Sequence, residues 1–209
     1  MPSRNLIREF EENAYYHVYN RGVEKRTIFL DDQDYTVFLG LLKKYLLGVQ
    51  TSKTNRHLVK RIDDQVQLLA YCLMPNHFHL LLHQTSLSGV STLMRRVATG
   101  YSMYFNDRYN RVGSLFQGTY KASRINADDY LHHISRYIHM NPDNYQVWPY
   151  SSYKNYLGQR KQDWLQPEAV LDIFYNDPKQ YQEFLSDYAE TRDERNILKW
   201  QLANNPEEI

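Results

Sequence analysis

The chain has 209 residues, a net charge of +1 and a single cysteine, Cys72. This length allows one sizeable core, and the apolar stretches fall short of the ~20 residues that a membrane-spanning helix needs. The first residues are polar and acidic, unlike the apolar core of a secretory signal. A lone cysteine inside an apolar run is typical of a buried strand thiol. We therefore expect a cytoplasmic protein and exclude a membrane-spanning one.

The small net charge conceals an uneven distribution of charge. From Ser91 to Asn126 there is one acid, Asp107, and there are six basic residues: Arg95, Arg96, Arg108, Arg111, Lys121 and Arg124. From Asp163 to Ile209, eleven acids face four basic residues. The basic middle is either a surface that follows a phosphate backbone or an ordinary solvated helix face. The 19 tyrosines also offer stacking surfaces for unpaired bases.

The first elements follow one another clearly in the pattern. Residues 15–21, rich in tyrosine with a β-branched valine, predict a strand. The apolar stripe of residues 32–47 predicts a helix, which either Asp31 or Asp32 caps at its N-terminus. Residues 51–64 are polar and are interpreted as a loop.

The next two strands carry the most informative pair of side chains. Residues 66–74 and 77–83 predict two strands, separated by a proline–asparagine break and paired as a hairpin. Alternate side chains of a strand share a face, so His77 and His79 point one way while Phe78 points into a core. Because a neutral imidazole is a common metal ligand, the two histidines form half of a metal site.

The remaining elements alternate between helix and strand. Residues 91–109 predict a long helix, and residues 115–125 contain the next strand, in which Gly118 indicates a bulge or a close backbone approach. A further helix over residues 128–140 ends before Pro142.

The order of these elements is β-α-β-β-α-β-α. The first six match a ferredoxin-like α+β sandwich, with an antiparallel sheet, helices on one face and the histidine-bearing strand in the centre. The C-terminal part is polar and mostly helical in pattern. We place the boundary between a main domain, residues 1–156, and a helical acidic C-terminal extension, residues 157–209.

The helix over residues 128–140 supplies candidates that complete the site. His133, Tyr137 and Asn141 are spaced four residues apart, so helical spacing places them along one stripe. His139 is two residues from the tyrosine and should face elsewhere. Such a stripe is either a functional surface or a solvated helix face.

Several segments together resemble a known family. The segment Pro75–Leu81 resembles the His–hydrophobic–His motif of the IS200-like transposases, the single-tyrosine (Y1) branch of the HUH endonucleases. Four further segments resemble those of the REP-associated tyrosine transposase subgroup: residues 16–22, 113–121, 136–142 and 148–153. The resemblance covers about residues 13–156 and therefore implies a catalytic function for the main domain.

The resemblance implies a reaction and roles for particular residues. Such enzymes cut single-stranded DNA by attack of a tyrosine hydroxyl, which leaves a 5′-phosphotyrosine and a free 3′-OH, and the strands are later rejoined. Tyr137 matches the nucleophile. His77, His79 and Asn141, where better-known members have glutamine, match the ligands of a divalent ion, Mg²⁺ or Mn²⁺. His133 is a candidate phosphate contact or base, with a structural role as the alternative.

The same resemblance implies a DNA partner. We expect single-stranded or hairpin DNA, held by the six basic residues between Ser91 and Asn126, and a monomer or a homodimer. The expected activity is a metal-dependent DNA nuclease and strand transferase, that is, a transposase. The alternative is a catalytically silent, domesticated transposase that binds hairpin DNA or regulates, using the same surface without Tyr137.

Overall fold

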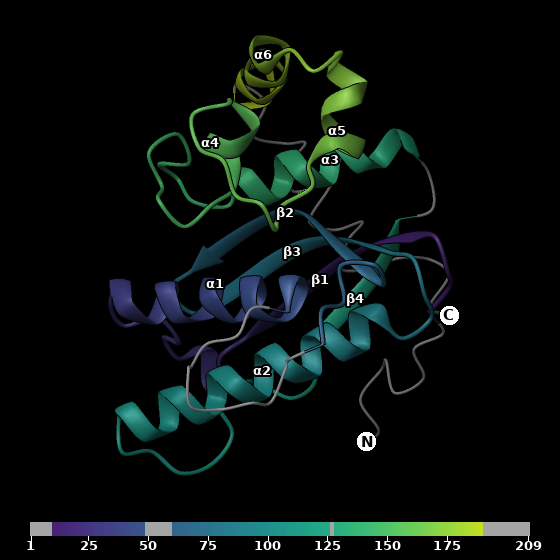
Figure 1. Ribbon diagram of the computed structural model, residues 1–209. Helices are drawn as coiled ribbons and strands as arrows, with labels where there is room; N and C mark the ends of the chain where they lie inside the picture. The colour runs from purple at the N-terminus through teal and green to yellow at the C-terminus, as the bar shows by residue number, and fades with distance from the viewer. Residues whose placement is uncertain (1–9, 49–59, 126–127, 190–209) are drawn as a thin grey trace, which may run out of the picture.

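The computed structural model describes residues 10–48, 60–125 and 128–189, and Figure 1 shows their arrangement. An antiparallel sheet has the order β2-β3-β1-β4 and is built from β1 (Ala14–Arg21), β2 (Val66–Met74), β3 (His77–Gln84) and β4 (Lys121–Ile125). Two helices, α1 (Asp32–Leu47) and α2 (Gly89–Arg108), cover one face, and α3 (Asp128–His139) covers the other. The α+β sandwich with β3 in the interior of the sheet is confirmed.

The start of α1 illustrates why the elements were predictable. The Asp31 side chain accepts hydrogen bonds from the backbone N–H groups of Gln33 and Asp34, at 3.1 and 3.2 Å. These are groups that a helix leaves without an internal partner, so an aspartate at this position stabilises the first turn. The helix ends at Gly48, whose φ of 68° favours glycine. Asp31 is thus the cap, and the predicted helix is confirmed.

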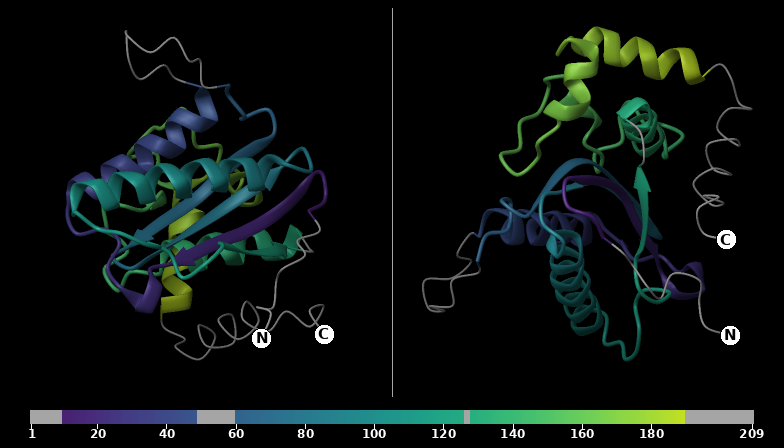
Figure 2. Two further views of the ribbon diagram at one scale, coloured as in Figure 1. Left: turned by 90° about the horizontal axis from the view of Figure 1, so that it is seen from below. Right: turned by 90° about the vertical axis from the view of Figure 1, so that its right-hand side faces the viewer.

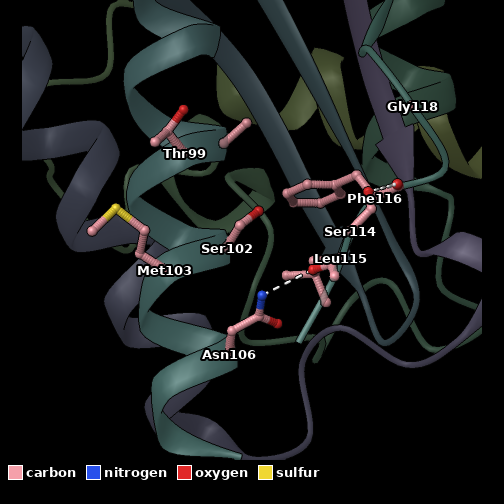
Figure 3. A pocket seen from close by; sticks show the side chains of 10 residues that line it. Thr99, Ser102, Met103, Asn106, Ser114, Leu115, Phe116 and Gly118 are labelled. Carbon is pink, nitrogen blue, oxygen red and sulfur yellow. Dashed lines mark hydrogen bonds between the residues drawn. The ribbon is translucent and has the colours of Figure 1, made fainter. Parts of the chain in front are cut away.

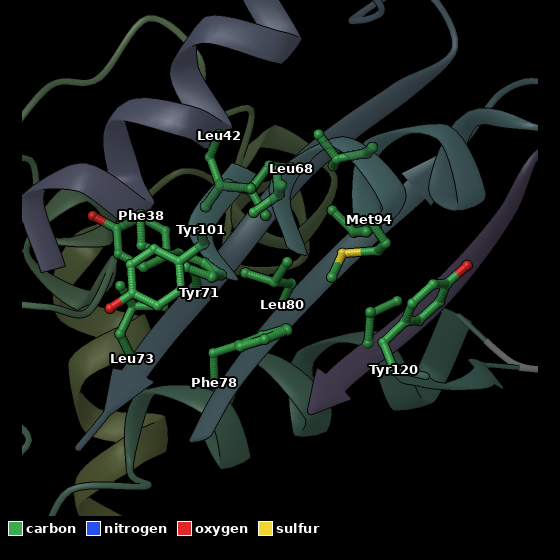
Figure 4. Packing of buried hydrophobic residues seen from close by; sticks show 14 of the residues in the cluster. Phe38, Leu42, Leu68, Tyr71, Leu73, Phe78, Leu80, Met94, Tyr101 and Tyr120 are labelled. Atoms are coloured by element: carbon green, nitrogen blue, oxygen red, sulfur yellow. The ribbon is translucent and has the colours of Figure 1, made fainter. Parts of the chain in front are cut away.

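The alternation of β3 divides the core between the two faces of the sheet. Phe78, Leu80 and Leu82 are buried against α1 and α2, in the cluster that Figure 4 shows. Leu81 points to the opposite face, where it packs with Cys72, a free buried thiol as expected, and with residues of α3. Burying each large apolar side chain contributes about 1.5–3 kcal/mol, so both faces are anchored.

The connection into β4 differs from the predicted strand. Residues 115–120 form a loop, and β4 begins only at Lys121. Gly118 lies in this loop with a φ of 121°, a conformation that takes it out of the strand, and a Cβ there would meet nothing within 4 Å. The glycine therefore marks a turn in the loop rather than a bulge or a close approach.

The C-terminal extension packs on α3, on the side away from the sheet. Its described part contains α5 (Glu168–Leu171), a short 3-10 helix η2 (Asp172–Phe174) and α6 (Pro178–Ala189), and the turn α4 (Tyr153–Tyr156) precedes it. Figure 2 shows α3 lying between the sheet and these helices. Residues 190–209 of the predicted extension lie outside the described residues. None of the helices in the described part is long and apolar enough to cross a membrane.

Candidate functional site

The site is built on two neighbouring strands whose alternate side chains face α3. On β3 these side chains are His77 and His79, whose ring centroids lie 5.0 Å apart. The antiparallel register places Tyr19 of β1 opposite His79 and Arg21 opposite His77. Because the strands are paired along their length, the sheet fixes the spacing of the two histidines as the sequence pattern predicts.

A third histidine, His17 of β1, is hydrogen-bonded to His79. His17 Nε2 and His79 Nδ1 are 2.9 Å apart and share a hydrogen bond, and both rings are buried. Burial lowers the pKa of His17 to about 3 and that of His79 well below its usual value, so both rings are neutral. The hydrogen bond occupies Nδ1 of His79 and orients the ring, which leaves Nε2 to act as a ligand.

Sequence reasoning missed His17. The signal was present in the alternation of β1, because His17, Tyr19 and Arg21 occupy one face of the strand while Val18 and Asn20 occupy the other. An antiparallel pairing of this strand with β3 would have placed the polar face of β1 beside the two histidines. That pairing is a property of the tertiary structure and leaves no signal in a single motif.

Tyr137 reaches this cluster from α3. Its ring meets the rings of His79 and His17 edge-on, at centroid distances of 5.5 and 5.8 Å. Burial raises the pKa of Tyr137, and Tyr19 acts in the same direction, whereas a hydrogen bond with Asn141 lowers it. The phenol is therefore protonated at neutral pH and reacts as a nucleophile only when its proton is removed.

Asn141 also meets His77, in an arrangement that suits a cation. The Asn76 amide donates from Nδ2 to the Lys25 carbonyl, so its Oδ1 accepts the hydrogen of His77 Nδ1, 2.6 Å away. Burial lowers the pKa of His77, and a neutral ring then carries a lone pair on Nε2. That nitrogen lies 3.0 Å from Asn141 Oδ1, another electron-pair donor. A cation placed between the two would satisfy both lone pairs.

The spacing of these donors fits a divalent ion. An octahedral Mg²⁺ holds its ligands at about 2.1 Å, so two ligands at right angles lie about 3.0 Å apart. Over the part of the chain that the structure describes, no cluster of three or more His, Cys, Asp or Glu side chains is arranged to hold a metal. The side chains that could hold such an ion are two imidazoles and one amide oxygen, from His77, His79 and Asn141. Imidazole ligands favour Mn²⁺ over Mg²⁺.

His133 faces the C-terminal extension instead of the cluster. Its Nδ1 lies 2.9 Å from an Arg136 guanidinium nitrogen, and its ring packs against His132 and Phe184. Burial lowers the pKa of His133 to about 4. These contacts give the residue a packing partner on α6, and Tyr137 and Asn141 are the two members of the predicted stripe that the structure brings together.

Of the six predicted DNA-binding residues, Lys121 lies beside the site. It pairs with Tyr19 across the β1–β4 ladder, and its Nζ is 5.9 Å from the centre of the Tyr19 ring. Arg124, three residues later, pairs with Tyr16 on the opposite face and forms an ion pair with Glu11. Lys121 and the exposed Arg21 therefore supply positive charge at the edge of the cluster.

The other four basic residues lie on α2 or in the turn after it, across the sheet from Tyr137. Arg108 binds Asp31 and the buried Asp34, and Arg111 binds the side chain of Asn106. Arg96 donates to the Lys60 carbonyl, and Arg95 is exposed. The strongest of these interactions fasten α2 to α1 and so have a structural purpose of their own.

A pocket lies on this same far side. It has a volume of about 370 Å³, between α2 and residues 113–118, and Ser102, Asn106 and Ser114 are among its polar lining residues. Figure 3 shows the hydrogen bond from Asn106 to the Gly113 carbonyl, at 2.9 Å, that ties the loop to the helix. The pocket is separated from the histidine cluster by the sheet and is not part of it.

Comparisons with known proteins agree with this fold. The sequence model of the family described as "Transposase IS200 like" matches residues 11–141. The fold is that of an α+β protein of the Y1 transposase type. Because residues 11–141 make up more than half of the chain, the chain belongs to the IS200-like transposase family.

Two solved structures resemble the chain. One is a REP-associated tyrosine transposase bound to a REP hairpin, with 17% identity and a TM-score of 0.54, covering 78% of this chain and 92% of that one. The other is a candidate transposase from Deinococcus radiodurans R1, with 14% identity and a TM-score of 0.39, covering 66% of this chain and 95% of that one. None of the curated proteins compared with the chain matches it.

Proposed function

We propose that this chain is a metal-dependent, single-stranded DNA endonuclease and strand transferase with Tyr137 as its nucleophile. The observation that carries the proposal is the position of Tyr137, whose ring meets the buried rings of His79 and His17 edge-on. A phenol thus lies beside two neutral imidazoles, and the neighbouring His77 contacts the side chain of Asn141. Residues 1–156 form the catalytic domain in this proposal, and residues 157–209 form the extension.

The chemistry is a transesterification of a DNA phosphodiester onto the phenol. Tyr137 Oη gives its proton to water and forms a bond to phosphorus as the bond from phosphorus to the 3′-oxygen breaks, and the 3′-oxygen takes up a proton from water. The products are a 5′-phosphotyrosine and a free 3′-OH, and attack by a 3′-OH on the phosphotyrosine rejoins a strand. His77, His79 and Asn141 would hold a divalent ion, which would supply Lewis-acid polarisation of the phosphate.

The protein's own groups prepare this step. The edge-on contacts of the Tyr137 ring with His79 and His17 orient the phenol before the strand arrives. The hydrogen bond from His17 orients His79. The positive charges of Arg21 and Lys121 flank the cluster and suit the phosphates on either side of the reacting one.

The substrate is proposed to be single-stranded DNA beside a hairpin. The REP-associated transposase that shares this fold is bound to a REP hairpin, which supports the same class of ligand here. Tyr19, half-buried beside Lys121, offers a ring against which an unpaired base can stack. The cleavage chemistry requires a DNA strand that reaches the site on the sheet face. We also propose that the protein acts as a monomer or a homodimer.

A direct assay tests the proposal against its alternative, a silent hairpin-binding protein. The protein is incubated with hairpin-bearing single-stranded DNA and Mn²⁺, and the products are separated under denaturing conditions. A DNA–protein adduct that survives denaturation supports catalysis. Binding to the same DNA without any adduct contradicts the proposed activity and favours the alternative.

The position of Lys121 predicts which face of the protein meets DNA. Replacing it (Lys121→Ala) is expected to weaken binding of the single strand and to lower the slope of log affinity against log salt by about 1, because one phosphate contact is lost. Arg95→Ala, on the exposed side of α2, is the matched control. It should leave the affinity for DNA and its salt dependence unchanged. Titrations at several salt concentrations measure this, and a larger effect at Arg95 would place the DNA on the α2 face.

The hydrogen bond between His17 and His79 predicts a role in metal affinity. Replacing His17 (His17→Leu) removes the partner of His79 Nδ1 and is expected to raise the Mn²⁺ concentration for half-maximal adduct formation by about 10- to 100-fold. Ser123→Ala, at the position paired with His17 on β4, is the control. An unchanged Mn²⁺ requirement in His17→Leu would show that His17 does not support the ligand.

A further inference from the structure

His139 is the most completely hydrogen-bonded ring in α3 among the described residues, and it is not part of the cluster described above. Its side chain is fully buried, and both ring nitrogens have partners. Nδ1 lies 2.7 Å from the Tyr181 hydroxyl of α6, and Nε2 lies 2.7 Å from the Ser152 hydroxyl. Because His139 follows Tyr137 by two residues, the two side chains leave α3 in nearly opposite directions.

The hydrogens on one side of this ring can be assigned from the acceptors. The Ser135 hydroxyl donates to the backbone carbonyl of His132 at 2.8 Å, since a carbonyl can only accept. Ser135 Oγ is therefore the acceptor in its 3.0 Å contact with the Tyr181 hydroxyl. Tyr181 then has no hydrogen left for His139, so it accepts one, and Nδ1 of His139 carries it.

On the Nε2 side of His139, the hydrogen bonds run in the same donor-to-acceptor direction. Ser152 Oγ accepts a hydrogen bond from the backbone N–H of Tyr71, at 2.9 Å. The Ser152 hydroxyl has two acceptors within reach, the Tyr71 carbonyl at 3.2 Å and His139 Nε2 at 2.7 Å. Full burial favours the neutral ring, and with its hydrogen on Nδ1 the bare Nε2 takes the hydrogen of Ser152 at the shorter distance. The result is an ordered chain of donors that runs from β2, through Ser152 and His139, to Tyr181 of α6 and back to α3.

We propose that His139, Ser152 and Tyr181 are positioning residues that fix the rotation of α3 about its own axis. A rotation by one residue, about 100°, would carry Tyr137 away from His79 and His17, and the chain of hydrogen bonds opposes it. The C-terminal extension is then part of the machinery that seats the nucleophile, because Tyr181 belongs to it. The inference rests on the proposed function, because only that function gives the position of Tyr137 a catalytic purpose.

The first test removes one hydroxyl. The variant Tyr181→Phe keeps the ring and loses both hydrogen bonds, and kcat for adduct formation is expected to fall about 10- to 100-fold, because a small misplacement of a reacting group has an effect of this size. KM for DNA should be unchanged, since Arg21 and Lys121 lie on the sheet. The matched control is Tyr175→Phe, at an 84% exposed position of the same extension, which should change neither.

The second test measures position without relying on activity. Magnetisation transfer in NMR between the rings of Tyr137 and His79, whose centroids lie 5.5 Å apart, should weaken in Tyr181→Phe and persist in Tyr175→Phe. A contact that persists in both overturns the inference. Failure of wild-type protein to form any adduct overturns the proposed function instead, and the ring contact still decides whether the network positions Tyr137.

The third test examines the direction of the hydrogen bonds through His139. It can still be carried out if Tyr181→Phe does not fold. Nitrogen chemical shifts of His139 are expected to show hydrogen on Nδ1 in the wild type. In Ser135→Ala the Tyr181 hydroxyl loses its acceptor and should donate to Nδ1, so the hydrogen moves to Nε2. Hydrogen on Nε2 in the wild type, or no change in Ser135→Ala, contradicts the assignment on which the inference depends.

Discussion

Replacing the proposed nucleophile (Tyr137→Phe) is expected to abolish the covalent DNA–protein adduct while leaving hairpin binding intact. The variant keeps the ring that packs against His79 and His17 and removes only the oxygen that forms the bond to phosphorus. Residual cleavage should fall by about 10³-fold or more, as when other enzymes lose their nucleophile. Denaturing electrophoresis of labelled DNA measures the adduct, and a binding titration measures affinity.

A tyrosine on the same helix provides the control. Tyr130 is 47% exposed on α3 and has no contact with the two histidines among those described, so Tyr130→Phe should form the adduct at the wild-type rate. An adduct that persists in Tyr137→Phe would show that another residue is the nucleophile. Loss of the adduct in both variants would instead indicate that the helix as a whole has been disturbed.

Removing the metal, or a residue proposed to hold it, is expected to have the second large effect. Chelation by EDTA and the variant His77→Ala should each slow cleavage by about 10³-fold, equivalent to about 4 kcal/mol of lost transition-state stabilisation. His77→Ala also removes one of the two lone pairs that face each other across 3.0 Å, so Asn141 alone is left on that side. Added Mn²⁺ should restore activity after EDTA but not in His77→Ala.

His83→Ala is the matched control for this experiment. His83 lies at the other end of β3 on the same face, where it bonds to Gln67 and stacks on Tyr15. The variant should keep the Mn²⁺ dependence of the wild type. Equal activity of His77→Ala and His83→Ala, each in saturating Mn²⁺, would contradict a metal-binding role for His77.

Most of the fold could be predicted because its signals are local. The alternation of β3 and the break before it determine where His77 and His79 point, and the cap at Asp31 sets the start of α1. The exception is the loop before β4. There Gly118 was interpreted as part of a strand, and its conformation depends on how residues 113–120 cross from α2 to the sheet edge.

The candidate site was predictable only in part, because its remaining contacts join distant segments. The resemblance to the family implies the pair His77 and Asn141, whereas the bond between His17 and His79 requires knowledge of which strands pair. The basic residues illustrate the same limit. Sequence places Lys121 and Arg108 in one positive segment, but the structure puts them on opposite faces of the sheet, and Arg108 is held by Asp34.

The bond between His139 and Tyr181 has a consequence for the protein as it emerges from the ribosome. Domains generally fold from the N-terminal end during synthesis, and contacts between distant residues form late. All four strands precede α3, so the sheet with its histidines can be complete before Tyr181 has been made. If the hydrogen bond between His139 and Tyr181 positions α3 as we propose, Tyr137 becomes fixed against the sheet only after α6 docks. An incomplete chain would thus carry the donors for a metal but no seated nucleophile, and it would leave the DNA uncut.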